Sequence, residues 1–180
     1  MKKFTALTLT LLLSFSSCQS KKNSNPLHGT IYRDIKTIQA FRDYEFLGGM
    51  VIGSEDDSGN HNYAVTHIRK GKNDVLIFER IIRRKDSPKL DYKILDTISI
   101  NTLNDSLEIL YGVCRQDTVE KSEIIAIVYI DIEKTFFNRV IKAWKADISR
   151  EKIIRIENLK GIDCINEGDG GCLDESSNGE

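Results

Sequence analysis

The sequence predicts an α+β fold, in which a single domain is built mainly from an antiparallel sheet of six to eight strands with one or two helices. Short apolar runs alternate with clusters of turn-forming residues through most of the chain, which is typical of strands and hairpins. One segment near the start of the domain instead carries apolar residues at helical spacing. No repeat of 20–50 residues is visible, so the pattern does not indicate a solenoid or a propeller.

The expected helix lies within residues 30–46. Its apolar residues are spaced by three or four positions, at Ile31, Ile35, Ile38 and Phe41. This spacing predicts an amphipathic helix that covers one face of the sheet. A strand that begins near Ile31 is the alternative. Gly48 and Gly49 then interrupt the pattern, and Met50 is expected to begin a strand.

The expected strands follow in order along the rest of the chain. Two apolar runs surround a short loop that contains Gly71, which predicts a β-hairpin, and Pro88 is expected to end that pair. The run 124–132 is almost continuously apolar and is therefore expected in the centre of the sheet. The segment 136–156 is ambiguous between a helix and a closing hairpin, and its polar interruption favours the hairpin. The expected strands are 63–68, 75–82, 92–100, 107–114, 124–132 and the pair within 136–156.

The first 17 residues have the features of a secretory signal peptide. Lys2 and Lys3 precede an apolar stretch that runs to Phe15, and small residues follow it. A membrane-spanning helix needs about 20 apolar residues, so this stretch is too short to remain as an anchor. We therefore expect residues 1–17 to be removed.

The end of this leader, Phe15-Ser16-Ser17-Cys18, resembles the lipobox of bacterial lipoproteins. Phe15 departs from the pattern, because Leu is usual there. The resemblance implies that Cys18 carries fatty acyl chains, such as palmitate, and becomes the new N-terminus. Two or three chains would hold the protein stably on a membrane. The predicted organisation is a signal peptide (1–17), a lipidated N-terminus and flexible tether (18–29), a globular domain (30–162) and an acidic, Gly-rich tail (163–180).

The resemblance also implies a location in the cell envelope. Gln19 replaces the Asp that commonly retains lipoproteins at the inner membrane, which favours the outer membrane. Lys21 and Lys22 replace the acidic cluster that some lineages use for export to the cell surface, which favours the periplasmic face.

Six acidic residues and no basic ones occupy the last twenty positions. The remaining body is only mildly basic, so nucleic acid is not an expected partner.

Four cysteines are present, at Cys18, Cys114, Cys164 and Cys172. If Cys18 is acylated, three remain in an oxidising compartment, where disulfides form, and one of them stays unpaired. Cys114 lies in an apolar run, which favours its pairing with Cys164. A bond between Cys164 and Cys172, which would close a small loop, is the alternative.

No catalytic or metal-binding motif stands out. His61 and His67 would face the same side of a strand if both lay on it, and with the acidic loop near them they are candidates for an enzymatic site. Cys114 with a distant histidine is the only conceivable nucleophile, and a buried or disulfide-bonded cysteine is the better interpretation of it. Residues 163–175 depart from the spacing of a calcium loop, and Cys164 and Cys172 without nearby histidines make a poor zinc site. The acidic residues 55–57 have the composition of an ordinary solvated hairpin loop. We therefore expect no catalytic residues, no metal and no cofactor.

Three stretches of the domain are similar to small lipoproteins of Gram-negative bacteria that have no established activity. They are residues 92–97, 142–146 and 161–168. The resemblance supports a lipid-anchored envelope protein, and we expect a non-enzymatic domain that binds a partner or a ligand. Two alternatives are an immunity protein against a periplasmic toxin and an enzyme with a site near His61 and His67.

Overall fold

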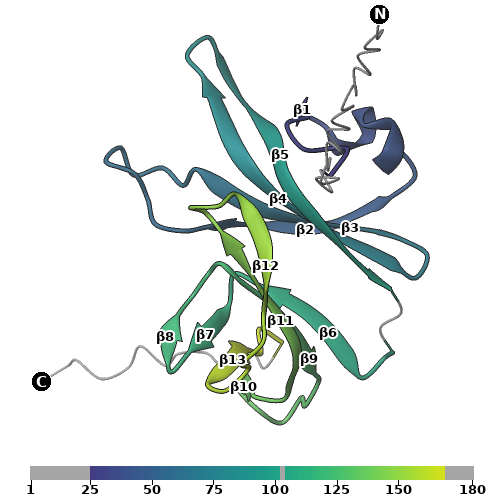
Figure 1. Ribbon diagram of the computed structural model, residues 1–180, viewed down its shortest axis with the longest axis vertical. Coiled ribbons are helices and arrows are strands. Elements are labelled where there is room, and N and C mark those ends of the chain that lie inside the picture. Colours follow the sequence, from purple (N-terminus) through teal and green to yellow (C-terminus); the bar gives the residue numbers. More distant parts are fainter. Residues whose placement is uncertain (1–24, 102–103, 169–180) are drawn as a thin grey trace, which may run out of the picture.

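The computed structural model describes residues 25–101 and 104–168, and these residues form an all-β fold of thirteen strands (Figure 1). The strands are Ile31–Tyr32 (β1), Glu45–Ile52 (β2), Tyr63–Lys70 (β3), Asn73–Arg84 (β4), Ser87–Asn101 (β5), Leu107–Tyr111 (β6), Cys114–Gln116 (β7), Val119–Glu120 (β8), Ile124–Tyr129 (β9), Phe136–Phe137 (β10), Val140–Asp147 (β11), Lys152–Ile156 (β12) and Ile162–Ile165 (β13). They make three antiparallel sheets. Sheet A has the order β1-β5-β4-β3-β2, sheet B the order β12-β11-β9-β6, and sheet C the order β10-β13-β7-β8.

The predicted α+β class is wrong, because the described residues contain no helix of seven or more residues. In place of the expected helix, the chain forms β1 and two 3-10 helices, η1 (Ile35–Thr37) and η2 (Gln39–Phe41). Ile38 separates them in an extended conformation, with φ −79° and ψ 115°. The i,i+3 spacing of the buried apolar residues fits the three residues per turn of a 3-10 helix as well as it fits an α-helix. The number of strands was also underestimated, because several are only two residues long.

Several individual elements of the sequence prediction are confirmed. β3 and β4 form a hairpin around a two-residue turn, in which Gly71 has a φ of +59°, a conformation that glycine adopts without steric cost. β9 lies in the interior of sheet B, between β11 and β6, and β11 pairs with β12 as a hairpin. Pro88, however, lies within β5 near the tip of the long β4–β5 hairpin rather than after it.

Three apolar clusters lie between the layers, and they explain which strands are apolar throughout. Residues such as Leu76, Phe78 and Ile125 fill the space between sheets A and B. The opposite face of sheet A, to which β1 contributes Tyr32, packs against the 3-10 helices. The outer face of sheet B packs against sheet C. β4 and β9 are therefore covered on both faces, which agrees with their nearly continuous apolar sequences.

Both ends of the described chain are attached to the sheets. The Asn25 amide donates to Thr97 Oγ1 over 2.8 Å, and the Gly29 N–H donates to the Ile94 carbonyl. The folded part thus includes residues of the expected tether. At the other end, β13 begins at the expected domain boundary, residue 162, and extends past it to Ile165, where it pairs with β7 and β10. Within the described residues, no helix has the length and apolar character needed to cross a membrane.

Candidate ligand-binding site

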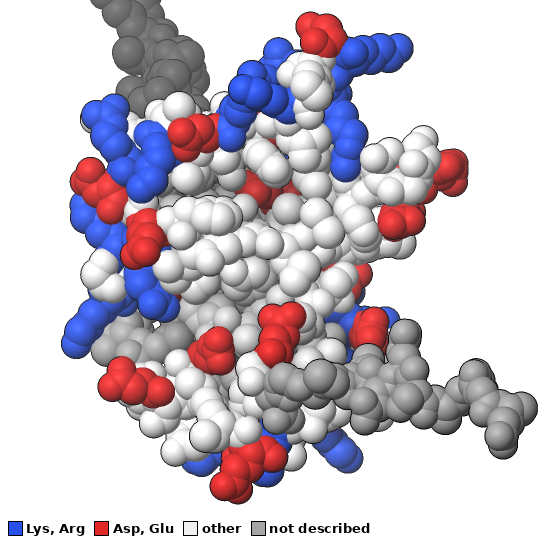
Figure 2. All heavy atoms as spheres, turned by 180° about the vertical axis from the view of Figure 1, so that it is seen from behind, with Lys and Arg blue, Asp and Glu red and all other residues white. Residues whose placement is uncertain are grey.

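A cavity of about 470 Å³ opens on the face of sheet A that the N-terminal segment covers only in part. Its walls come from β1 and η1 on one side, from β2 on the other, and from β3, β4 and β5 beneath. Figure 2 shows this face of the molecule, where uncharged residues surround a hollow and atoms of acidic residues are visible inside it. The lining is mainly apolar, with Phe46, Val51, Ala64, Ile81 and Leu90 among its residues.

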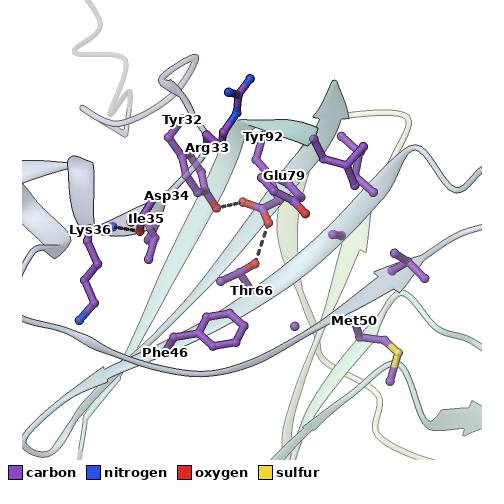
Figure 3. Close-up of a pocket in the computed structure, with 15 residues that line it drawn as sticks. Tyr32, Arg33, Asp34, Ile35, Lys36, Phe46, Met50, Thr66, Glu79 and Tyr92 are labelled. Carbon is purple, nitrogen blue, oxygen red and sulfur yellow. Dashed lines mark hydrogen bonds between the residues drawn. The ribbon is translucent and has the colours of Figure 1, made fainter. Parts of the chain in front are cut away.

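Glu79 is the polar group at the floor of this cavity (Figure 3). Only 1% of Glu79 is exposed. The Thr66 hydroxyl donates to Glu79 Oε1 over 2.6 Å, and the Tyr32 hydroxyl donates to Glu79 Oε2. Three separate strands, β1, β3 and β4, therefore hold one carboxyl group in a fixed position.

The position of Glu79 follows from strand alternation. Side chains two residues apart on a strand share a face, so Glu79 continues the face of Val75 and Ile77, which pack under the N-terminal segment. A register shift between Phe78 and Glu79 interrupts the pairing with β5 at this point. On β2, Gly49 lies opposite Thr66 in the register. Because Gly49 has no side chain, the space above Thr66 and Glu79 stays open.

Burial changes the proton affinity of the groups at the floor. Loss of solvation raises the pKa of Glu79 to about 7, although the hydrogen bonds from Thr66 and Tyr32 act in the opposite direction. Burial, together with the neighbouring Glu79 charge, raises the pKa of Tyr32 well above its usual value, so Tyr32 keeps its proton and remains a donor. Burial also raises the pKa of Tyr92, which lines the same cavity.

No Lys or Arg of the described chain forms an ion pair with Glu79. Two basic residues line the cavity, but each has another partner. Arg33 Nε lies 2.8 Å from Asp91 Oδ1, and Lys36 Nζ donates to the Tyr44 carbonyl. Buried carboxylates in proteins are usually paired with a cation or protonated. The cavity therefore has a carboxyl group whose charge no described side chain balances.

The two candidate histidines do not form a common site. His61 lies before β3, where its Nδ1 is 3.0 Å from the Gly53 carbonyl oxygen and its Nε2 is 3.7 Å from Glu55 Oε1. His67 lies within β3, is 6% exposed, and places Nε2 2.7 Å from Asp74 Oδ1. The structure thus gives each histidine its own partners instead of a shared ligand.

His67 and Asp74 line a second, more polar cavity of about 710 Å³, with Tyr111 among its walls. Burial lowers the pKa of His67, although Asp74 raises it. Arg69 Nε also donates to Asp74 Oδ1, over 2.7 Å. None of the described residues around this cavity is a Ser, Thr or Cys, and the ring of Tyr111 meets the His67 ring edge-on, with 5.8 Å between the ring centroids. We interpret Arg69 and Asp74 as a structural ion pair to which His67 is hydrogen-bonded.

The acidic loop at residues 55–57 is stabilised by its own hydrogen bonds. Asp56 Oδ1 accepts from the backbone N–H of Ser58 and of Asn60, and Asp56 Oδ2 accepts from the Asn62 amide. Within the described residues, no group of three or more His, Cys, Asp or Glu side chains is arranged to hold a metal ion. Asp56 therefore acts as a turn cap.

The structure joins Cys114 to Cys164, the pairing that the sequence favoured. The two residues lie directly opposite each other on β7 and β13, and their exposed fractions are 1% and 0%. Disulfides form and persist in oxidising compartments, so this bond points to an extracytoplasmic location. Cys18, the predicted lipidation site, and Cys172 both lie outside the described residues.

Comparison with protein-family models, curated proteins and solved structures found no match. Function is therefore inferred from the residues of this chain alone. Sequence reasoning missed Glu79, although a signal was present. Glu79 is an acidic residue between Ile77 and Ile81 on the same face of an apolar strand, and a charge in that position is rarely buried without a specific reason.

Proposed function

We propose that the protein is a lipid-anchored, non-enzymatic envelope protein that binds a small ligand in the cavity above Glu79. The observation that carries the proposal is a mainly apolar cavity on whose floor three polar side chains converge. Ligand sites have volumes of about 300–1,000 Å³ and combine apolar walls with a few fixed polar groups. The cavity of about 470 Å³ fits this description.

The anchoring part of the proposal rests on the leader and on the disulfide. The leader ends in a motif that resembles a lipobox, and the disulfide is consistent with export. A protein held at a membrane by acyl chains keeps its domain close to the lipid surface, where amphiphilic molecules concentrate. This position is consistent with a cavity that combines apolar walls and a polar floor.

Filling the cavity is expected to weaken ligand binding. Ala64 is buried at the cavity wall, so an Ala64→Leu substitution places three additional carbon atoms in or beside the ligand space. We expect the full-length protein to bind the neutral, apolar fluorophore N-phenyl-1-naphthylamine at one site. Fluorescence titration should show at least about a tenfold weaker affinity for A64L, which corresponds to about 1.4 kcal/mol.

The matched control for this experiment is Ala40→Leu. Ala40 lies in η2, is exposed, and does not line the cavity. This variant makes the same chemical change and should bind the fluorophore as the wild type does. Equal binding by all three proteins, or no saturable binding by the folded wild type, would contradict the proposed function.

Acylation of Cys18 is tested separately. When the protein is expressed with its own leader, it should incorporate radioactive palmitate and sediment with membranes, and a Cys18→Ala variant should do neither. The matched control is Cys172→Ala, which removes the other cysteine outside the disulfide and should leave both properties unchanged. Palmitate labelling of the Cys18→Ala protein would refute the anchor.

A further inference from the structure

We infer that the ligand of the Glu79 cavity is an organic ammonium ion with an apolar body, and that its positive group contacts the Glu79 carboxylate. The inference rests on the proposed function, because it names the chemical class of that ligand. The observation behind it is a buried carboxyl group that lines a cavity and has hydrogen-bond donors but no cation among the described residues.

The hydrogen bonds of Glu79 leave room for a further donor. An ionised carboxylate has about four acceptor positions on its two oxygens. Thr66 donates to one oxygen and Tyr32 to the other, which uses one position on each. A ligand ammonium group can donate to the positions that remain, and it also supplies the positive charge that a buried carboxylate requires.

The cavity walls match the other parts of such a ligand. Tyr32, Phe46 and Tyr92 bring three aromatic rings to the cavity, and the labelled Phe46 ring lies below the Glu79 carboxyl group in Figure 3. The faces of aromatic rings attract cations within about 6 Å of the ring centre. Val51 and Ile81 provide apolar surface for the body of the ligand.

The two basic side chains at the cavity mouth, Arg33 and Lys36, are directed away from the Glu79 carboxyl group (Figure 3). Arg33 is engaged by Asp91, and Lys36 donates to a backbone carbonyl. Asp34 adds a negative charge to the same lining. An anionic ligand would place its own charge beside the Glu79 carboxylate, which is unfavourable where solvent cannot screen it. A neutral ligand would fill the cavity but leave that carboxylate unpaired.

The inference predicts a dependence of binding on pH. The groups that face Glu79 are Tyr32 on β1, Thr66 on β3 and Tyr92 on β5, and the charged residues lining the cavity are Arg33, Asp34 and Lys36. Tyr32 and Tyr92 keep their protons because their pKa values are raised. With a pKa of about 7 for Glu79, the ionised fraction rises about tenfold between pH 6 and pH 8. Affinity for an ammonium ion should rise by about the same factor.

The experiment compares three ligands of nearly equal shape: cyclohexylmethylamine, cyclohexylmethanol and cyclohexanecarboxylate. Each is used to displace N-phenyl-1-naphthylamine from the full-length protein. At pH 8 the amine should displace the fluorophore at a concentration at least about tenfold below that of the alcohol, and the carboxylate should be weakest. Between pH 6 and pH 8 the amine should gain about tenfold while the alcohol stays constant.

The Glu79→Gln variant should bind the amine no more tightly than the alcohol. The matched control is Glu45→Gln, because Glu45 is an exposed residue of β2 outside the cavity. This control should keep the tenfold preference for the amine. If Glu79→Gln does not fold, the pH dependence of the wild type decides the question. Displacement by the alcohol as strong as by the amine, or an amine affinity independent of pH, would overturn the inference while the fluorophore still reports a ligand site. Absence of fluorophore binding to the folded protein would instead remove the proposed function itself.

Discussion

Replacing both Cys114 and Cys164 by Ala is expected to lower the free energy of unfolding by about 4 kcal/mol. The two residues are 50 positions apart in the sequence, and a loop of this length gives about 4 kcal/mol in the chain-entropy description of a cross-link. The cross-link holds β13 to β7, and both sulfur atoms lie in the cluster between sheets B and C. Urea unfolding of the wild type and the double variant at pH 7 measures the difference.

The matched control for this prediction is Cys172→Ala, which removes a cysteine that takes no part in the Cys114–Cys164 bond. Its free energy of unfolding should equal that of the wild type within about 0.5 kcal/mol. Alkylation without a reducing agent should leave Cys114 and Cys164 unmodified, and mass spectrometry of the treated protein checks this. Labelling of these two thiols in the folded protein, or a loss of less than about 1 kcal/mol, would show that the bond does not stabilise the fold as described.

The Cys114–Cys164 pair shows what a sequence can and cannot predict about a disulfide. The apolar run around Cys114 correctly suggested a buried sulfur. The choice of partner depends on the register between β7 and β13, in which Cys164 lies opposite Cys114. These strands are distant in sequence, and no local pattern determines their alignment. The apolar run around Cys114 therefore favoured the Cys114–Cys164 pairing, whereas the alignment of the two cysteines is known only from the fold.

The wrong helix has a similar explanation. Local spacing in residues 30–46 was compatible with an α-helix, and the same spacing is satisfied by two 3-10 turns that place Ile35, Ile38 and Phe41 on sheet A. The decisive contribution is long-range, because β2 pairs with β3 from Glu45 onward and β1 pairs with β5. Strand pairing with distant segments overrode a weak local preference. The hairpins β3–β4 and β11–β12 were predictable because their partners are neighbours in sequence.

The candidate site was less predictable than the fold. Glu79 receives hydrogen bonds from Tyr32 and Thr66, which are 47 and 13 positions away. Only the presence of an acidic residue in an apolar strand was visible in the sequence. The histidines attracted attention because of their chemistry, yet His67 is paired with Asp74 on the neighbouring strand. The alternative that the chain is an immunity protein, and the expectation that it binds a protein partner, stay predictions from the sequence.

The second large effect is a loss of stability as the pH rises through 7, caused by Glu79. Burial raises its pKa from 4.5 to about 7, so between these values the folded protein binds a proton that the unfolded chain has released. This stabilisation is fully present below pH 4.5 and is lost as the pH rises through about 7. A difference of about 2.5 pKa units corresponds to about 3 kcal/mol.

His67 acts in the opposite direction, so the effect of Glu79 must be measured as a difference. Burial lowers the pKa of His67, so its contribution to stability is present above the ordinary histidine pKa of 6.5 and is lost as the pH falls below that value towards the lowered pKa. Urea unfolding of the wild type and of Glu79→Gln at pH 4.5, 6, 7 and 8 separates the two. Relative to Glu79→Gln, the wild type should lose about 3 kcal/mol between pH 4.5 and pH 8, because only the wild type releases a buried proton there.

Parallel pH profiles for the two proteins would mean that Glu79 is not a buried, unpaired acid. The charge argument for an ammonium ligand would then lose its physical basis, even if the cavity itself binds an apolar molecule.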